Sequence, residues 1–116
     1  METFPWHQLS SMDGLEQISK KSFEMPVVIF KHSTRCNISS IAKMRLEEDA
    51  LTLGSQVHFY YLDLLNHRDI SAKIAEKYHV HHESPQILVI KDDECILDAS
   101  HLDIQADEIE EVIAAC

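Results

Sequence analysis

The stretch VVIFKHSTRCNISS, residues 27–40, joins a predicted buried strand to a predicted helix. VVIF is short, apolar and rich in β-branched residues, which is typical of a strand inside a sheet. After the loop HSTR, apolar residues recur at helical spacing, at Ile38, Ile41, Ala42, Leu46 and Ala50. We therefore expect Cys36 at the point where a strand ends and a helix begins.

Strand and helix patterns alternate on both sides of this stretch. We expect strands at 6–9, 27–30, 57–64, 86–90 and 95–97. We expect helices at about 10–22, from Cys36 or Asn37 to 50, at 68–79 and at 109–116, with Ser10 or Ser11 as the N-cap of the first. Asp92 and Asp93 predict a turn between the last two strands. Alternation implies parallel strands with crossover connections, and the hairpin adds an antiparallel edge. The pattern predicts one α/β domain over residues 1–116, with a mixed central sheet and helices on both faces.

Composition excludes several classes of function. The formal net charge of −10 argues against nucleic-acid or anionic-membrane binding, because both need a basic surface. No apolar run is long enough to span a bilayer, and the first residues lack the basic and apolar regions of a secretory signal. The three cysteines, Cys36, Cys95 and Cys116, form no CxxC pair, which indicates a reducing, cytoplasmic setting. We expect Cys95 and Cys116 to be structural.

The predicted position of Cys36 favours a reactive thiolate. Unpaired N–H groups at a helix start contribute about 0.3–1 kcal/mol to a nearby anion. This would lower a thiol pKa from about 8.5 by something near one unit. Arg35, and His32 when protonated, would lower it further, and Ser39 one turn later could donate a hydrogen bond to the sulfur. A serine cannot resolve a mixed disulfide, so CxxS predicts a mechanism with one thiol.

Three segments resemble the monothiol bacilliredoxins, the YtxJ-like branch of the thioredoxin superfamily. They are FKHSTRCNIS at 30–39, HESPQ at 82–86 and SHLDI at 100–104, and the similarity extends from about Trp6 to Ile113. The resemblance implies a thioredoxin-like fold, βαβαβαββα, with Cys36 as the nucleophile. It also implies that Pro85 is a cis-proline facing the thiol and that Ser84 presents backbone groups to a bound thiol or peptide.

The activity implied by the resemblance is the removal of bacillithiol from protein mixed disulfides. Bacillithiol would be a thiol co-substrate, and no bound cofactor or metal is expected. Implied partners are S-bacillithiolated proteins and a thioredoxin-type or bacillithiol disulfide reductase. Candidate contacts to the small thiol are Thr34, Arg35, Ser84, Pro85 and Gln86. Asn37 departs from the family's usual T-x-C-P-I-S pattern, which leaves the thiol pKa open.

Two alternatives remain at the level of sequence. One is a non-enzymatic binding module in which Cys36 is merely tolerated. The other is a metal or iron–sulfur carrier that uses Cys36 and a small thiol. The nearest ligand-like cluster is His79, His81, His82 and Glu83, but histidines are also favourable near the end of a helix.

Overall fold

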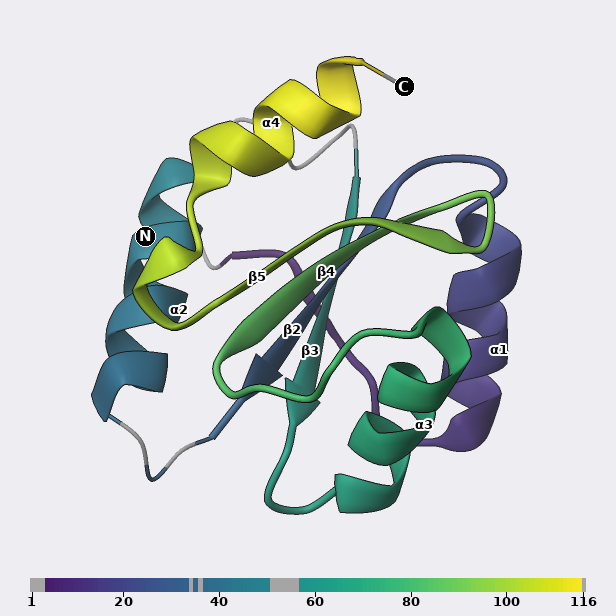
Figure 1. The fold of residues 1–116 in the computed structure, drawn as a ribbon, viewed down its shortest axis with the longest axis horizontal. Coiled ribbons are helices and arrows are strands. Elements are labelled where there is room, and N and C mark those ends of the chain that lie inside the picture. Colours follow the sequence, from purple (N-terminus) through teal and green to yellow (C-terminus); the bar gives the residue numbers. More distant parts are fainter. Residues whose placement is uncertain (1–3, 34, 36, 51–56, 116) are drawn as a thin grey trace.

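Strands and helices alternate along the chain in the predicted order (Figure 1). The computed structural model describes residues 4–33, 35, 37–50 and 57–115. The strands are β1 (Trp6–Gln8), β2 (Val27–His32), β3 (His58–Asp63), β4 (Gln86–Lys91) and β5 (Glu94–Ser100). The helices are α1 (Met12–Lys21), α2 (Asn37–Asp49), α3 (Arg68–Tyr78) and α4 (Ala106–Ala114), with a 3-10 helix η2 (His101–Asp103) before α4.

The strands form one mixed sheet in the order β1-β3-β2-β4-β5. β3 is parallel to both β1 and β2, whereas β4 is antiparallel to β2 and to β5. α2 supplies the crossover that the parallel neighbours β2 and β3 require. Asp92 and Asp93 have φ angles of 52° and 59°, in the left-handed region of tight hairpin turns. The predicted hairpin and mixed sheet are both confirmed.

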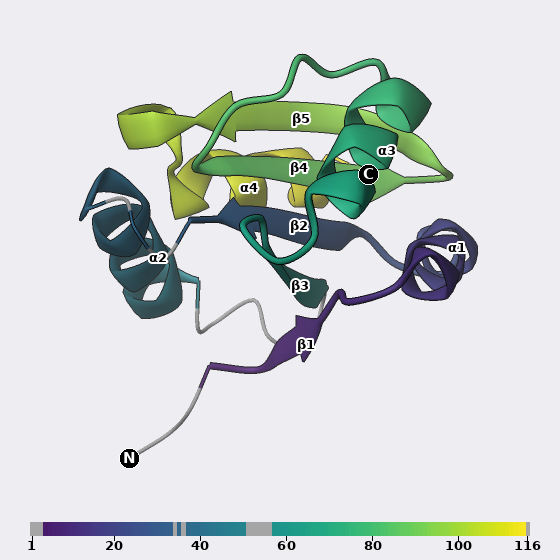
Figure 2. The ribbon, with the colours of Figure 1, turned by 90° about the horizontal axis from the view of Figure 1, so that it is seen from below.

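Helices cover both faces of the sheet (Figures 1 and 2). Each face has its own apolar core. Alternate residues of a strand point to opposite faces. Val28 and Phe30 accordingly pack on the side of α2 and α4, with Leu46 and Ile109. Val27 and Ile29 pack with α1 and α3 on the other side.

α1 begins where the sequence predicts a cap. Ser11 has an extended backbone, and its hydroxyl accepts a hydrogen bond of 3.0 Å from the Gly14 N–H. This bond satisfies one of the N–H groups that a helix start leaves unpaired. Leu15 and Ile18 then form the buried face of the helix.

β2 is longer than predicted, because it includes Lys31 and His32. The prediction that HSTR forms a loop is therefore wrong for His32. The strand continues because β2 is central: Lys31 pairs with Leu62 and Gln86 on its two sides, and His32 pairs with Asp63. All six residues of β2 are buried, including these two polar ones.

The buried face of α2 also differs from the prediction. Ala42, Leu46 and Ala50 are buried as expected, but Ile38 and Ile41 remain 43% and 45% exposed. Each of these isoleucines precedes a buried residue, Ser39 or Ala42, and one residue turns a helix by about 100°. The two side chains therefore lie on the outer side of α2.

Candidate functional site

The site begins where β2 leads into α2. α2 starts at Asn37, directly after Cys36 in the sequence, as predicted. Arg35 is exposed. Cys36, Thr34 and Cys116 lie outside the described residues, so their predicted roles remain predictions.

His32 and Ser39 form a buried pair that ties the end of β2 to the first turn of α2. His32 Nδ1 lies 2.6 Å from Ser39 Oγ, and the same hydroxyl accepts a 3.1 Å hydrogen bond from the Ser33 N–H. A hydroxyl has only one proton to donate. When His32 is neutral with its ring proton on Nε2, the Ser39 hydroxyl donates its own proton to Nδ1.

Burial, with Lys43 as the next cause, lowers the pKa of His32 below its usual value of 6.5. The ring is therefore mainly neutral at neutral pH. The predicted help of a protonated His32 to the thiolate would therefore increase as the pH falls. At neutral pH, His32 instead holds the Ser39 hydroxyl in place.

Aromatic rings surround His32 on the α2 face. Its ring stacks on Phe30 at 5.7 Å and lies 5.5 Å from the Tyr61 ring. Trp6 stacks on the same Phe30 at 5.7 Å, and its indole N–H donates a 2.6 Å hydrogen bond to Glu47 of α2. The ring of His32 is thereby fixed between the sheet and α2.

The segment before β4 lies beside the end of β2. The Ser84–Pro85 peptide bond is cis, which confirms the cis-proline that the family resemblance implied. The Pro85 carbonyl accepts a 2.9 Å hydrogen bond from the His101 N–H. The half-buried Ser84 has a buried hydroxyl with no hydrogen-bond partner among the described residues. The side chain of Ser84 thus retains hydrogen-bonding capacity.

Gln86 supports this segment from inside. It is only 1% exposed, and its Nε2 donates a 3.0 Å hydrogen bond to the His81 carbonyl. Its Oε1 is buried without a partner in the described part of the chain. This position suits the bracing of residues 81–86 better than contact with a ligand at the surface.

Lys31 is a feature that we did not single out from the sequence. It is fully buried, on the face of the sheet opposite to His32. Its Nζ lies 3.4 Å from the Ser71 carbonyl oxygen and 3.4 Å from His82 Nδ1, while Ser71 Oγ lies 3.1 Å from the same nitrogen. Burial lowers the pKa of Lys31 from 10.5 to about 8. The available signal was a lysine that directly follows the apolar run VVIF.

The histidine-rich segment does not gather into a metal site. His79 ends α3 in the left-handed conformation. The nitrogens Nε2 of His81 and His101 lie 4.0 and 3.8 Å from the Glu83 carboxylate. Within the described ranges, no three histidine, cysteine or acidic side chains are grouped so that they could hold a metal ion.

Cys95 has the character of a structural thiol. It is half-buried on β5, and its sulfur lies 3.3 Å from the Leu97 carbonyl oxygen. Burial raises its pKa to about 11, with Asp98 as the next cause. Because the thiolate is the nucleophile, Cys95 is inert at neutral pH.

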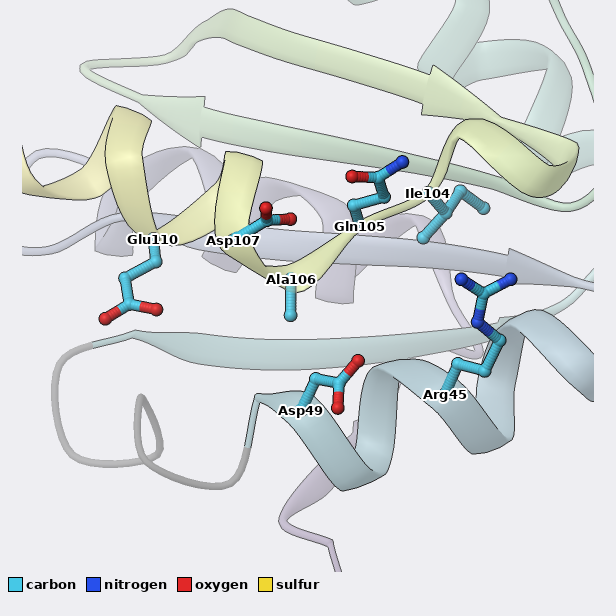
Figure 3. A pocket seen from close by; sticks show the side chains of 7 residues that line it. All are labelled: Arg45, Asp49, Ile104, Gln105, Ala106, Asp107 and Glu110. Atoms are coloured by element: carbon cyan, nitrogen blue, oxygen red, sulfur yellow. The ribbon is translucent and has the colours of Figure 1, made fainter.

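A cavity of about 380 Å³ separates α2 from the start of α4 (Figure 3). Its lining includes three carboxylates, Asp49, Asp107 and Glu110, and the guanidinium of Arg45. The surplus of negative charge makes this cavity a poor host for an anionic ligand.

Comparison with known proteins decides the family. The model of the family described as Monothiol bacilliredoxin BrxC matches residues 7–109. The chain belongs to the monothiol bacilliredoxin family. A solved structure described as a candidate oxidoreductase with a thioredoxin fold is 30% identical to this bacilliredoxin. The match covers 93% of each chain, with a TM-score of 0.82.

More distant neighbours confirm the thioredoxin fold of this bacilliredoxin. Thioredoxin from Malassezia sympodialis is 19% identical, covers 93% of this chain and 87% of its own, and has a TM-score of 0.73. Thioredoxin from Trypanosoma brucei brucei is 13% identical over 97% and 92% of the two chains, with a TM-score of 0.76. Family and fold together support a role in thiol redox chemistry. Among the described residues, no helix has the length and apolar character needed to cross a membrane.

Proposed function

We propose that this bacilliredoxin removes bacillithiol from protein mixed disulfides through Cys36. The observation that carries the proposal is the start of α2 at Asn37, directly after Cys36 in the sequence. The preceding strand, β2, pairs with Gln86, the residue that follows cis-Pro85. A helix start favours a thiolate, and the thiolate is the attacking form. The odd number of cysteines, without a CxxC pair in the sequence, supports a reducing, cytoplasmic setting for the reaction.

The reaction is a thiol–disulfide exchange in two steps. The Cys36 thiolate attacks the bacillithiol sulfur of the modified protein, a new S–S bond forms, and the protein thiolate leaves. A second low-molecular-weight thiolate then attacks the Cys36 mixed disulfide. Cys36 is released as a thiolate, and the two small thiols leave as a disulfide for a reductase to reduce.

An outside thiol is needed because the residue one helical turn after Cys36 is a serine, Ser39. Its hydroxyl cannot attack the mixed disulfide. Its oxygen is already engaged with His32 and with the Ser33 N–H. The adduct on Cys36 is thus expected to persist until a second thiol arrives.

Mass spectrometry of the intact protein tests the proposal. After incubation with oxidised bacillithiol, we expect one adduct per chain, mapped to Cys36 and reversed by a reductant. Cys36→Ser should abolish both the adduct and the release of bacillithiol from a modified test protein. Cys95→Ser is the matched control, since its thiol is inert, and it should behave like the wild type. Continued release of bacillithiol by Cys36→Ser would refute the proposal.

A further inference from the structure

The molecule contains a buried cation without a neutralising partner in the described structure. Lys31 is fully buried, and the contacts of its Nζ are the Ser71 carbonyl and His82 Nδ1, both at 3.4 Å. No carboxylate among the described residues forms an ion pair with it. A buried ammonium group is costly unless a negative charge or strong hydrogen bonds compensate it. A buried cation of this kind would attract an anionic ligand.

A cavity of about 280 Å³ lies on the same side of the sheet as this lysine. Ser71 and His82, which contact Lys31, also line the cavity, together with Leu64, Arg68 and Ala72. Arg68 is exposed and is the first residue of α3. Positive charge is thus concentrated at this point in a chain whose formal net charge is −10.

Nearby carboxylates do not cancel this charge. Glu83 follows His82 in sequence, but its carboxylate lies by His81 and His101 at 4.0 and 3.8 Å. Asp69 is exposed in the first turn of α3 and does not line the cavity. The cavity therefore favours an anion, in contrast to the acidic cavity between α2 and α4.

The cavity lies beside the segment through which thiol binding is proposed. Lys31 is paired in the sheet with Gln86, which follows the cis-Pro85. Figure 1 shows the connection from α3 to β4. Its residues, 79–85, include His82 and Pro85. Because His82 lines the cavity, one short segment of the chain connects the cavity to cis-Pro85.

We propose that the cavity lined by Arg68, Ser71 and His82, with Lys31 behind it, binds a carboxylate of the low-molecular-weight thiol. This inference rests on the proposed function. In bacillithiol the group would be the malyl unit, a dicarboxylate. Arg68 and Ser71 line the cavity, and a guanidinium can bind a carboxylate through two parallel bonds. Lys31 acts through the electrostatic attraction of its charge, which is stronger in the low dielectric around it.

Rates of Cys36 mixed-disulfide formation with two disulfides test the subsite. Bacillithiol disulfide carries carboxylates, whereas 2-hydroxyethyl disulfide carries none. For Arg68→Gln we expect a loss of about tenfold with bacillithiol disulfide and a change within about twofold with the neutral one, as befits a charge-assisted pair. Lys73→Gln is the matched control, because it removes an exposed charge from the same helix outside the cavity. It should leave both rates unchanged.

A second measurement does not depend on Cys36. In the Cys36→Ser variant, titration with L-malate should shift the amide NMR signals of residues 68–72 and 82, and adding Arg68→Gln should abolish the shifts. If malate binds while the wild type forms no adduct with bacillithiol disulfide, the proposed function fails and the subsite stands. Equal losses with both disulfides, or malate shifts that persist in Arg68→Gln, overturn the subsite. It is also overturned if the loss occurs only with bacillithiolated proteins, since the carboxylate then belongs to the protein substrate.

Discussion

Lys31 and His32 are consecutive residues that point to opposite faces of the sheet. His32 faces α2, where it pairs with Ser39. Lys31 faces the other side, where it contacts Ser71 of α3 and His82 of the segment before β4. Burial lowers the pKa of both. The consequences differ, because a histidine shifted down from 6.5 is neutral at pH 7, whereas a lysine with a pKa of about 8 is still mostly charged.

The pKa of Lys31 predicts a stability that depends on pH. The pKa is about 8 in the folded protein and 10.5 ordinarily, so the unfolded chain binds more protons between these values. The free energy of unfolding therefore rises with pH across this window. One pKa unit is about 1.4 kcal/mol, so the buried charge costs roughly 3 kcal/mol below pH 8.

Urea unfolding of Lys31→Met against the wild type measures this effect. Methionine fills a similar volume without a charge, so we expect the variant to be the more stable protein at pH 7, by about 1–3 kcal/mol. Its advantage should shrink as the pH rises from 7 to about 9.5. Taking the difference between the two proteins removes the contribution of other titrating groups. A difference that stays constant with pH would show that Lys31 keeps its ordinary pKa.

At the scale of single elements, local patterns predicted what local physics determines. The cap at Ser11 was readable because a serine before an apolar helical face satisfies a free N–H. The end of β2 was not readable, since Lys31 and His32 are polar and remain in the strand only because β3 and β4 pair with them. The outward direction of Ile38 and Ile41 likewise depends on how α2 lies on the sheet.

The N-cap of α1 offers a direct test at this scale. Ser11→Ala removes the hydroxyl that accepts the Gly14 N–H, and we expect a loss of about 1 kcal/mol in the free energy of unfolding. Ser10→Ala is the matched control, because Ser10 is exposed and makes no hydrogen bond within the described structure. Chemical denaturation of both variants provides the comparison. Equal losses would mean that Ser11 does not act as the cap.

At the scale of the whole molecule, two apolar cores sandwich one sheet, and α4 closes one of them. Ile109 of α4 is fully buried in the core on the α2 side. We expect Ile109→Ala to cost about 2–5 kcal/mol, through lost burial and the cavity left behind. Ile41→Ala, on the exposed side of α2, should cost less than about 1 kcal/mol. Urea midpoints of the two variants measure the contrast, and similar values would contradict this assignment of the core.

The order of elements and the mixed sheet followed from periodicity, because each element buries one face. The cis-proline came from the family resemblance, since it leaves no periodic pattern. The reactive position of Cys36 was inferred from the strand–helix pattern and stays a prediction. The contacts of Lys31 could not be predicted, because they join β2, α3 and the segment before β4, and their positions are set only by the assembled sheet.

The stacking of Trp6 has an optical consequence. It is the only tryptophan of the chain, and its indole is held between Phe30, which also carries the His32 ring, and a carboxylate of α2. Selective excitation of tryptophan therefore excites a single chromophore, whose emission wavelength depends on the polarity around it. The bacilliredoxin thus carries an intrinsic, label-free fluorophore on the same face of the sheet as the His32–Ser39 pair.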